Sequence, residues 1–446
     1  MKKNSLRLLF LCLIALVVYQ YPRLNIVTGF AAKSVCSCTF EAGRTLASIE
    51  QGDNDFSLVR YTHNTIDTLQ KTATASIVGL QKRTAVYKEG LGCVLLPSGT
   101  NTLQDPLLKP NRIHEFSPLA YPMGDAAQQD TVFPEVAYRQ LSKAVENAFD
   151  KEGAQEQRTR AVLVLYKDQL IAERYAPGFT SETKFLGWSM TKSITSAVLG
   201  ILKKQGKVTL SQDHLFPEWE SDERADITLG NLLQMNTGLA WEEDYNKVCD
   251  VTNMLFVDKD KAQTQLYKPL IGKPGQSWLY SSGVTNLLSG FIRHQFDNTQ
   301  DYLDFWYQSL IDRIGMHSMT IETDLTGNYL GSSYGWATAR DWAKFGLLYL
   351  HKGHWYGTQI LEESWVDFSR TPTHNSNTYG GHFWLNIDGQ AYPNAPHDLF
   401  SCNGYQGQYV FIIPSKEMVI VRFGLKEDPE FNVDTFLKEV LAAVEV

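Results

Sequence analysis

Two serines of this sequence are each followed by a lysine at the third position after them, within the stretch FTSETKFLGWSMTKS. The first pair is Ser181 with Lys184, and the second is Ser189 with Lys192. A neutral lysine amine can take the proton of a serine hydroxyl and activate it as a nucleophile without a histidine. Each pair is therefore a candidate for acyl transfer through serine.

The surrounding residues distinguish the two pairs. Ser181 lies in the polar stretch GFTSETK after a Pro-Gly pair, so we expect Lys184 to point into water and keep its proton. Ser189 begins a predicted helix, SMTKSITSAVLGIL, where unpaired N–H groups and the helix dipole favour an alkoxide. Lys192 shares a helix face with Ser189, and the apolar residues after it predict a buried amine with a lowered pKa. The alternative is an ordinary amphipathic helix with a polar first turn.

Two later stretches add candidate groups. Tyr280, in PGQSWLYSSGVTNLLSG, ends an aromatic turn before a predicted helix. A tyrosine beside a lysine amine can shuttle protons, since the cation favours phenolate, although simple packing at a helix start is the alternative. Gly404 and Gly407, in FSCNGYQGQYVFIIP, precede a predicted strand whose first N–H is placed to bind an oxyanion. The alternative there is a glycine-rich turn that enters an edge strand.

Residue periodicity outlines the elements that must position these groups. Hairpins are predicted at 160–178 and 408–424, with their turns at 167–169 and 414–417. Amphipathic or apolar helices are predicted at 134–153, 193–207, 227–239, 285–296, 338–353 and 433–446. Strands near both ends with helices between them indicate one sheet built from distant segments, with an inserted helical region. Residues 32–110 form an N-terminal extension of mixed character without strong helical periodicity.

The N-terminal 31 residues predict export. Lys2, Lys3 and Arg7 precede an apolar run from Leu8 to Tyr19, the pattern of a secretory signal. The run is shorter than the roughly 20 residues that a membrane span needs. A cleaved signal at 1–31 and a retained anchor that extends through Val27 are the two main alternatives, and a buried N-terminal element is the third. Export places the protein in the periplasm, either free or anchored to the inner membrane.

Export would also place five cysteines in an oxidising compartment: Cys36, Cys38, Cys93, Cys249 and Cys402. Their odd number leaves at least one free or paired between chains. Cys93 could bridge to Cys36 or to Cys38 and tie the extension together. No cysteine spacing matches a zinc site, and the HKGH stretch predicts a solvated turn rather than a metal site.

The overall charge excludes one class of partner. The 446 residues carry a net charge of −8, with a pI near 5.7. Phosphate binding needs a basic face, and the sequence contains no basic cluster, so we expect no nucleic-acid partner. We expect no metal and no cofactor. The oligomeric state and the physiological substrate stay open.

With Ser-x-x-Lys, then Tyr-x-small, then a glycine-bracketed strand in this order, the chain resembles the class C-like branch of the serine β-lactamase and penicillin-recognising superfamily. YGWATARDWAKFGLLYL and GYQGQYVFIIPSKEMVIVRFG are most similar to the 6-aminohexanoate-dimer (nylon-oligomer) hydrolases. The resemblance covers 111–446. It implies an α+β fold in which an antiparallel sheet, from 111–188 and 325–446, is flanked by helices and interrupted by a mostly helical region at about 189–324.

The resemblance also implies roles for individual residues. Ser189 would be the acylated nucleophile, Lys192 its general base, and Tyr280 a proton relay in acylation and deacylation. The backbone N–H groups of Ser189 and Gln408 would hold the oxyanion.

Two departures from the family pattern bear on the substrate. Ser282 stands where β-lactamases usually have the asparagine of Tyr-x-Asn, and Tyr405-Gln406-Gly407 replaces a motif that begins with lysine or histidine. The missing cation argues against substrates with a carboxylate, such as β-lactams and D-Ala-D-Ala peptides. It favours esters or amides with a neutral acyl side.

Four aromatic residues are predicted to form an apolar pocket for such substrates, although each could equally belong to the core: Trp188, Trp278, Trp336 and Tyr405.

The sequence therefore predicts a serine hydrolase that acts on a small ester or amide. Two alternatives remain: a cell-wall D,D-peptidase or β-lactamase, and a non-catalytic scaffold of the same fold. A Ser-His-Asp hydrolase is disfavoured because the GWSMT stretch around Ser189 lacks the glycine of a nucleophile elbow two residues later.

Overall fold

The computed structural model describes residues 2–103, 107–128, 130–153, 155–426 and 429–444, and between residues 2 and 20 it describes the side chain of Arg7 alone. The side chains of the apolar run predicted for export, Leu8 to Tyr19, thus lie outside the described residues. Within the described ranges, no helix is both long enough and apolar enough to cross a membrane.

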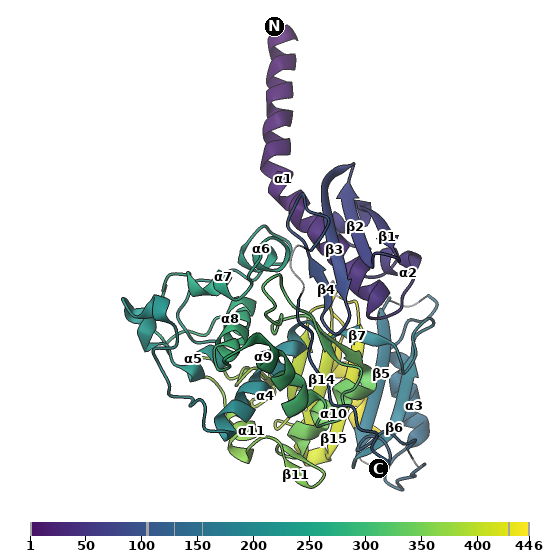
Figure 1. Cartoon of the computed structure of the whole chain (residues 1–446). Coiled ribbons are helices and arrows are strands. Elements are labelled where there is room, and N and C mark those ends of the chain that lie inside the picture. The colour runs from purple at the N-terminus through teal and green to yellow at the C-terminus, as the bar shows by residue number, and fades with distance from the viewer. Residues whose placement is uncertain (1, 104–106, 129, 154, 427–428, 445–446) are drawn as a thin grey trace.

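The N-terminal part of the chain is a long helix beside a small sheet. Helix α1 (Lys2–Phe40) projects from the body with its first half and lies across strands β2 and β3 with its second half (Figure 1). The sheet is antiparallel in the order β1 (His63–Asp67), β2 (Thr72–Ile77), β3 (Leu80–Lys88) and β4 (Gly92–Leu95).

The extension at 32–110 thus starts inside a helix that its sequence did not predict. Ala31, Ala32, Val35 and Cys36 are all buried, and their spacing places them on one face of α1, against the small sheet. Small side chains at these positions let the helix approach the strands closely, and they weaken the hydrophobic periodicity that a sequence reading depends on.

A disulfide and a buried ion pair hold α1 in place. Cys36 is bonded to Cys93 of β4, which chooses between the two pairings that the sequence left open. Cys38, Cys249 and Cys402 are free and buried. One turn before the disulfide, the buried amine of Lys33 pairs with the carboxylate of Glu322 in the body of the protein.

Removing this disulfide is expected to destabilise the protein. The bond joins residues 57 positions apart, and closing a loop of that length stabilises a folded state by about 2–4 kcal/mol. A Cys36→Ser/Cys93→Ser variant should lose that much free energy of unfolding in urea titrations. Dithiothreitol should lower the stability of the wild type and leave the variant unchanged. Equal stability of the two oxidised proteins would contradict the prediction.

The body of the protein is built on one antiparallel sheet. Its strands follow the order β12-β13-β14-β15-β5-β6, with β12 at Trp384–Leu385, β13 at Phe400–Gly404, β14 at Gln408–Ile413, β15 at Met418–Gly424, β5 at Thr159–Tyr166 and β6 at Gln169–Tyr175. Both predicted hairpins are present, and β5 pairs with β15, so the two ends of the domain meet in one sheet. Lys167 and Asp168 have φ of 46° and 59°, values that the tight β5–β6 turn requires.

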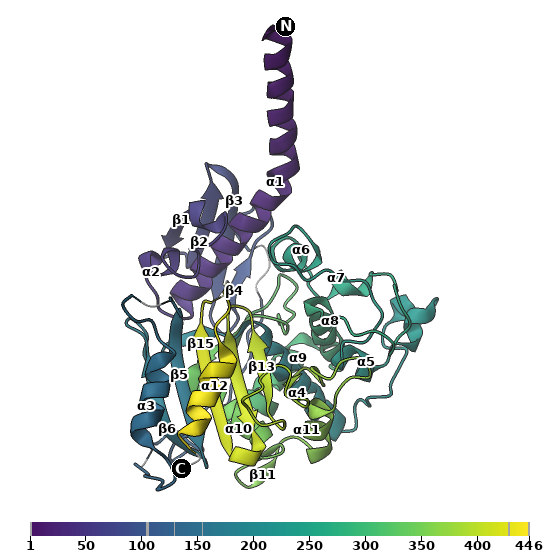
Figure 2. The same cartoon turned by 180° about the vertical axis from the view of Figure 1, so that it is seen from behind.

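Helices cover both faces of this sheet. Helices α3 (Tyr138–Asn147) and α12 (Val433–Ala442) pack on one face (Figure 2), and α10 (Ala339–Leu350) packs on the other. Thr338 caps α10 by accepting a hydrogen bond from the Asp341 N–H. The fold class predicted from the sequence is confirmed.

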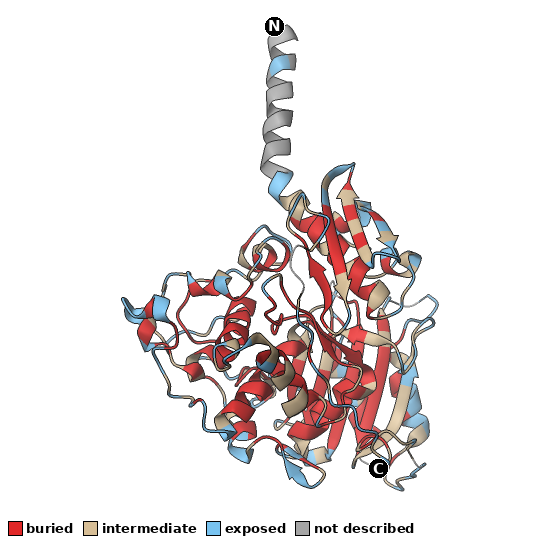
Figure 3. Ribbon diagram, in the orientation of Figure 1, coloured by how far each residue is buried: buried red, intermediate tan, exposed pale blue. Residues whose placement is uncertain are grey.

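The inserted region between the sheet segments is mostly helical. Its helices are α4 (Thr191–Lys204), α5 (Leu229–Leu233), α6 (Asp250–Phe256), α7 (Gln263–Leu266), α8 (Ser282–Arg293) and α9 (Thr299–Trp306). Helix α11 (Glu363–Arg370) comes after α10 in the chain, and a small sheet of β7 (Lys184–Leu186), β9 (Gly335–Thr338) and β8 (Thr320–Ile321) adjoins the region. Helices α4 and α8 are buried along most of their length (Figure 3), so their polar residues lie in a protein interior.

Candidate active site

Ser189 lies in a short 3₁₀ turn, Trp188–Met190, that leads directly into α4. The sequence placed Ser189 at the first turn of the α-helix, and the structure places it one short turn earlier. Trp188 has φ of 46°, a value that a bulky residue adopts only when its surroundings hold it there. Trp188 and Met190 are buried while Ser189 is half-buried, so solvent reaches part of the serine.

Lys192 meets the prediction made for its contact and its burial. Its side chain is 1% exposed, and Nζ lies 2.9 Å from Ser189 Oγ, 2.9 Å from Ser282 Oγ and 3.0 Å from the Ser332 carbonyl oxygen. Burial lowers the pKa of Lys192 to about 8, against the charge of Glu243, which raises it. A substantial fraction of the amine is therefore neutral near physiological pH and able to accept a proton.

The first Ser-x-x-Lys pair is differently arranged. The Lys184 amine pairs with the carboxylate of Glu41 at 2.8 Å and donates to Thr320 Oγ1 at 3.1 Å. The prediction that Lys184 points into water is therefore wrong, because the end of α1 supplies a partner that is distant in sequence. Ser181 Oγ bonds to its neighbour Glu182. The ion pair between Lys184 and Glu41, the residue after α1, ties the end of that helix to the body of the protein.

Tyr280 completes the cluster just before α8. Nζ of Lys192 lies 4.9 Å from the centre of the Tyr280 ring, and the Ser189 side chain is near enough to lower the pKa of the Tyr280 hydroxyl. Burial raises the pKa of Tyr280 well above its ordinary value, and the Ser189 side chain offsets only part of this rise. At neutral pH the Tyr280 hydroxyl therefore keeps its proton, and its role as a proton relay stays a prediction.

Replacing Tyr280 with phenylalanine should lower kcat for ester hydrolysis by at least about 10²-fold, since proton transfer by a positioned group contributes that much. The fold should be unaffected because the ring remains in its aromatic contacts with Tyr379 and Trp384. Steady-state kinetics with a p-nitrophenyl ester would measure the effect. Tyr379→Phe, which alters a neighbouring ring, is the control and should stay within about threefold of wild type. Full activity of Tyr280→Phe would remove its proposed role.

Glu243 was not found from the sequence. Its carboxylate accepts hydrogen bonds from Ser282 Oγ at 2.5 Å, from Trp241 Nε1 at 2.5 Å and from the Tyr245 hydroxyl at 3.1 Å. It thereby orients the hydroxyl of Ser282, which in turn accepts from Lys192. Alternation of Trp, Glu and Tyr at every second position is the signal that could have located it, because such residues share one side of an extended segment.

The third predicted motif forms the turn between β13 and β14. In the described part of the sheet, β13 pairs with β12 only at Phe400 and Ser401, and β13 then continues past the Trp188–Met190 turn. A Cβ on Gly404 would lie 2.2 Å from the Gly187 carbonyl oxygen, so only glycine permits this close approach. The strand and the serine-bearing turn are thus in direct contact.

Gln408 lies at the start of β14, paired with Gly404. Its side-chain amide donates to the carbonyl oxygens of Tyr405 at 2.9 Å and Gly424 at 2.7 Å, which fixes the turn. The carbonyl of Gly407 accepts a hydrogen bond from the buried Arg422 at 2.6 Å. The proposed oxyanion contact of the Gln408 N–H stays a prediction.

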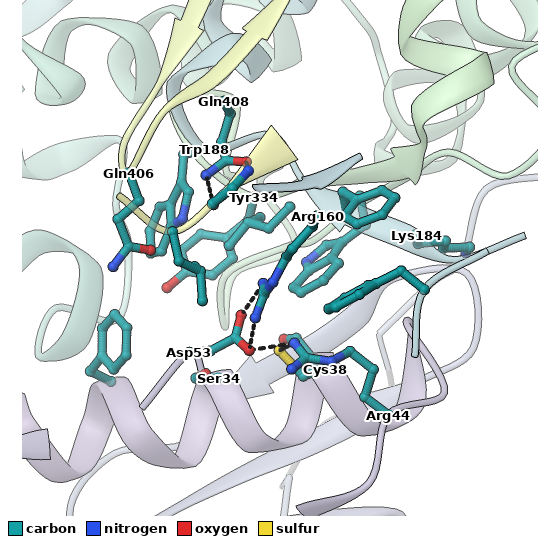
Figure 4. Close-up of a pocket in the computed structure, with 18 residues that line it drawn as sticks. Ser34, Cys38, Arg44, Asp53, Arg160, Lys184, Trp188, Tyr334, Gln406 and Gln408 are labelled. Carbon is teal, nitrogen blue, oxygen red and sulfur yellow. Dashed lines mark hydrogen bonds and ion pairs between the residues drawn. The ribbon is translucent and has the colours of Figure 1, made fainter. Parts of the chain in front are cut away.

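The four aromatic residues predicted to form one pocket are divided between two places. Trp278 packs against Tyr379 and Trp384, beside Tyr280. Trp188 packs against Tyr334 and Tyr405. Trp188 and Trp336 are buried together with residues of α1, which passes below Trp188 and Tyr334 in Figure 4.

Ion pairs fix α1 and its following loop against this side of the body. Asp53 binds Arg160 of β5 at 2.7 Å and also pairs with Arg44 (Figure 4). Burial alone would raise the pKa of Asp53, but the two arginines outweigh it and hold the pKa well below its ordinary value. The N-terminal part therefore forms a fixed wall beside Trp188, the residue before Ser189.

Comparison with known proteins shows that this chain is related to the beta-lactamase family. The beta-lactamase family model matches residues 145–443. The 6-aminohexanoate-dimer hydrolase of Paenarthrobacter ureafaciens is 25% identical over 302 residues, which cover 61% of this chain and 74% of that protein.

Two solved structures show the same fold. The match to a family VIII carboxylesterase has a TM-score of 0.53 at 16% identity and covers 71% of this chain and 98% of the carboxylesterase. The match to a mutant class C beta-lactamase has a TM-score of 0.51 at 14% identity and covers 68% of this chain and 96% of that beta-lactamase.

Proposed function

Since the chain belongs to the beta-lactamase family of serine hydrolases, we propose that it cleaves an ester or amide bond through an acyl-enzyme on Ser189. The observation that carries this proposal is the 2.9 Å contact between Ser189 Oγ and the buried amine of Lys192. A protein that only binds a partner has no use for a lysine whose pKa is lowered to about 8 beside a half-exposed serine.

In the proposed mechanism, neutral Lys192 takes the proton of Ser189 as Oγ attacks the substrate carbonyl carbon. The carbonyl π electrons move to oxygen, and the C–O or C–N bond to the leaving group then breaks. Tyr280 donates its proton to the leaving group and regains one from the lysine ammonium. Water attacks the acyl-enzyme through the same groups in reverse and releases the acid. Ser282, bonded to Lys192 at 2.9 Å, keeps the amine in place between the two half-reactions.

The preferred substrates in this proposal have a neutral acyl side. Tyr405, Gln406 and Gly407 place no cation at the position where relatives carry a lysine or histidine, so a substrate carboxylate has no partner there. The names of the 6-aminohexanoate-dimer hydrolase and of the carboxylesterase agree with amides and esters as the bond types. Labelling by a fluorescent penicillin would instead favour the D,D-peptidase or β-lactamase alternative.

Activity-based labelling tests the nucleophile and the enzyme class together. A fluorophosphonate probe should modify the native protein on the peptide that contains Ser189, as identified by mass spectrometry. Denaturation before labelling should prevent the reaction, because the lysine contact would be lost. Labelling at a different serine, or no labelling of the native protein, would overturn the proposal.

We further propose that the protein is exported and works in the periplasm, either free or membrane-anchored. The disulfide between Cys36 and Cys93 supports this, since such bonds persist in oxidising compartments. An alkaline phosphatase fused after the N-terminal extension should be active in bacterial cells. An inactive but expressed fusion would contradict export.

A further inference from the structure

A cavity lies between α1, the loop that contains Phe56 and the segment from Tyr245 to Phe256. Its wall includes Val27, Phe30, Phe56, Tyr245, Phe256 and Tyr405. The ring of Phe30 packs on Phe56 at 5.2 Å and on Phe256 at 5.5 Å, so α1 and α6 form the wall together. Figure 1 shows α6 beside the lower half of α1.

This cavity adjoins the catalytic cluster through two tyrosines. The rings of Tyr245 and Tyr405 stack at 4.7 Å. The Tyr245 hydroxyl donates to Glu243, which binds the Ser282 hydroxyl beside Lys192. The ring of Tyr405 lies 5.5 Å from that of Trp188, the residue before the proposed nucleophile.

The chemistry of the cavity is mainly apolar. Among the described residues that line it, only Arg23 and Lys247 are charged. The Lys247 side chain is 60% exposed and already pairs with Glu242 and Asp244, so it lies at the mouth with its charge compensated. A flexible alkyl chain fits the apolar walls, whereas a charged group would lose its hydration and, among the described lining residues, could find a free charge only at Arg23.

The position of the cavity relative to Tyr280 indicates which part of a substrate would enter it. The leaving group must lie next to its proton donor, and Tyr280 packs with Tyr379 and Trp384, none of which lines the cavity. With the leaving group beside Tyr280, the side of Trp188 and Tyr405 is open to the acyl group on Ser189.

We infer that this cavity is the acyl-chain subsite, and that the substrates are esters or amides of linear, uncharged acyl groups. This inference rests on the proposed acyl-enzyme mechanism. The second half of α1 then supplies part of the substrate site, so the subsite requires that residues 23–30 stay in the mature protein, as in the membrane-anchored form and not after cleavage at residue 31. The disulfide and the ion pairs keep this part in register with the nucleophile.

A rim substitution with a matched control tests the subsite. Val248 lines the cavity and is 43% exposed, so Val248→Trp should fill its mouth without disturbing the core. Val257 is 40% exposed, does not line the cavity and lies just beyond α6, so Val257→Trp is the control. The kcat/KM values of p-nitrophenyl acetate, octanoate and dodecanoate are compared for the wild type and both variants.

Each methylene buried in an apolar site strengthens binding by about fourfold. A substitution that keeps two or more methylenes of the acyl chain out of the cavity should therefore lower kcat/KM at least about tenfold. The wild type should prefer octanoate to acetate by more than tenfold. Val248→Trp should lower kcat/KM for octanoate and dodecanoate at least tenfold and that for acetate by less than threefold, and Val257→Trp should change none. A uniform loss, or no loss, would overturn the subsite.

Further controls separate this inference from the proposed function. Octyl acetate carries its chain on the leaving group, and a selective effect of Val248→Trp on that ester would overturn the acyl assignment. If the wild type hydrolyses no ester and the fluorophosphonate probe does not label Ser189, the proposed function fails, and direct binding of 11-(dansylamino)undecanoic acid then tests the cavity alone. Binding weakened at least tenfold by Val248→Trp and not by Val257→Trp would support the subsite, and equal binding would refute it.

Discussion

Ser189→Ala is expected to lower the hydrolysis of p-nitrophenyl acetate by at least about 10³-fold, to the level of the uncatalysed reaction. The alanine cannot form an acyl-enzyme, and removing a nucleophile that acts as a unit with its base costs nearly the whole catalytic effect. The melting temperature should change little, because Lys192 keeps its hydrogen bonds to Ser282 and to the Ser332 carbonyl. Initial rates and a thermal melt on the same preparation would check both parts.

Ser181→Ala is the matched control for this loss. It removes the serine of the other Ser-x-x-Lys pair, whose hydroxyl contacts Glu182 and whose Lys184 is bound to Glu41. Its activity should match the wild type. Substantial turnover by Ser189→Ala at normal stability would assign the nucleophile elsewhere, and loss of activity in Ser181→Ala would show that the two pairs had been distinguished incorrectly.

The second large effect concerns Lys192 and depends on pH. Because burial lowers the pKa of Lys192 to about 8, the neutral, base-competent fraction falls about tenfold for each pH unit below that value. The sign is fixed by chemistry, since only the deprotonated amine can accept the serine proton. We therefore expect kcat/KM to rise about tenfold from pH 6 to pH 7 and to level off above pH 9. Lys192→Met, of similar length and without the amine, should lose at least about 10³-fold at every pH.

Glu243→Gln provides a directional test of the same assignment. The Glu243 charge raises the pKa of Lys192, so its removal should move the midpoint of the pH profile to lower pH. A profile that keeps its midpoint in Glu243→Gln, or that falls as pH rises through 8, would contradict Lys192 as the base. Retained activity in Lys192→Met would contradict it independently.

The contacts that the sequence predicted correctly are local ones. Ser189 and Lys192 are three residues apart, so the turn and helix that they begin are enough to bring their side chains together. The same holds for the two hairpins, whose turns lie between adjacent strands. The family resemblance extended this local information to the antiparallel sheet as a whole.

The predictions that failed or were missing involve partners distant in the chain. Lys184 was expected in water, but Glu41, 143 positions earlier, binds its amine. Glu243 lies 39 positions before Ser282, and the Ser332 carbonyl lies 140 positions after Lys192, so no spacing rule links them. The pKa of Lys192 depends on this surrounding set, because desolvation is a property of everything packed around the amine.

The sequence by itself determined the candidate nucleophile, the candidate base, the two hairpins and the main helices of the body, because these depend on residues that are near one another along the chain. Only the tertiary structure decided that Lys192 is enclosed by Ser282 and Ser332, and that α1 lies against Trp188 to wall a cavity beside the site. The physical reason is that burial and cavity shape arise where distant segments pack together, and their free energy depends on the whole packed surface rather than on any one segment.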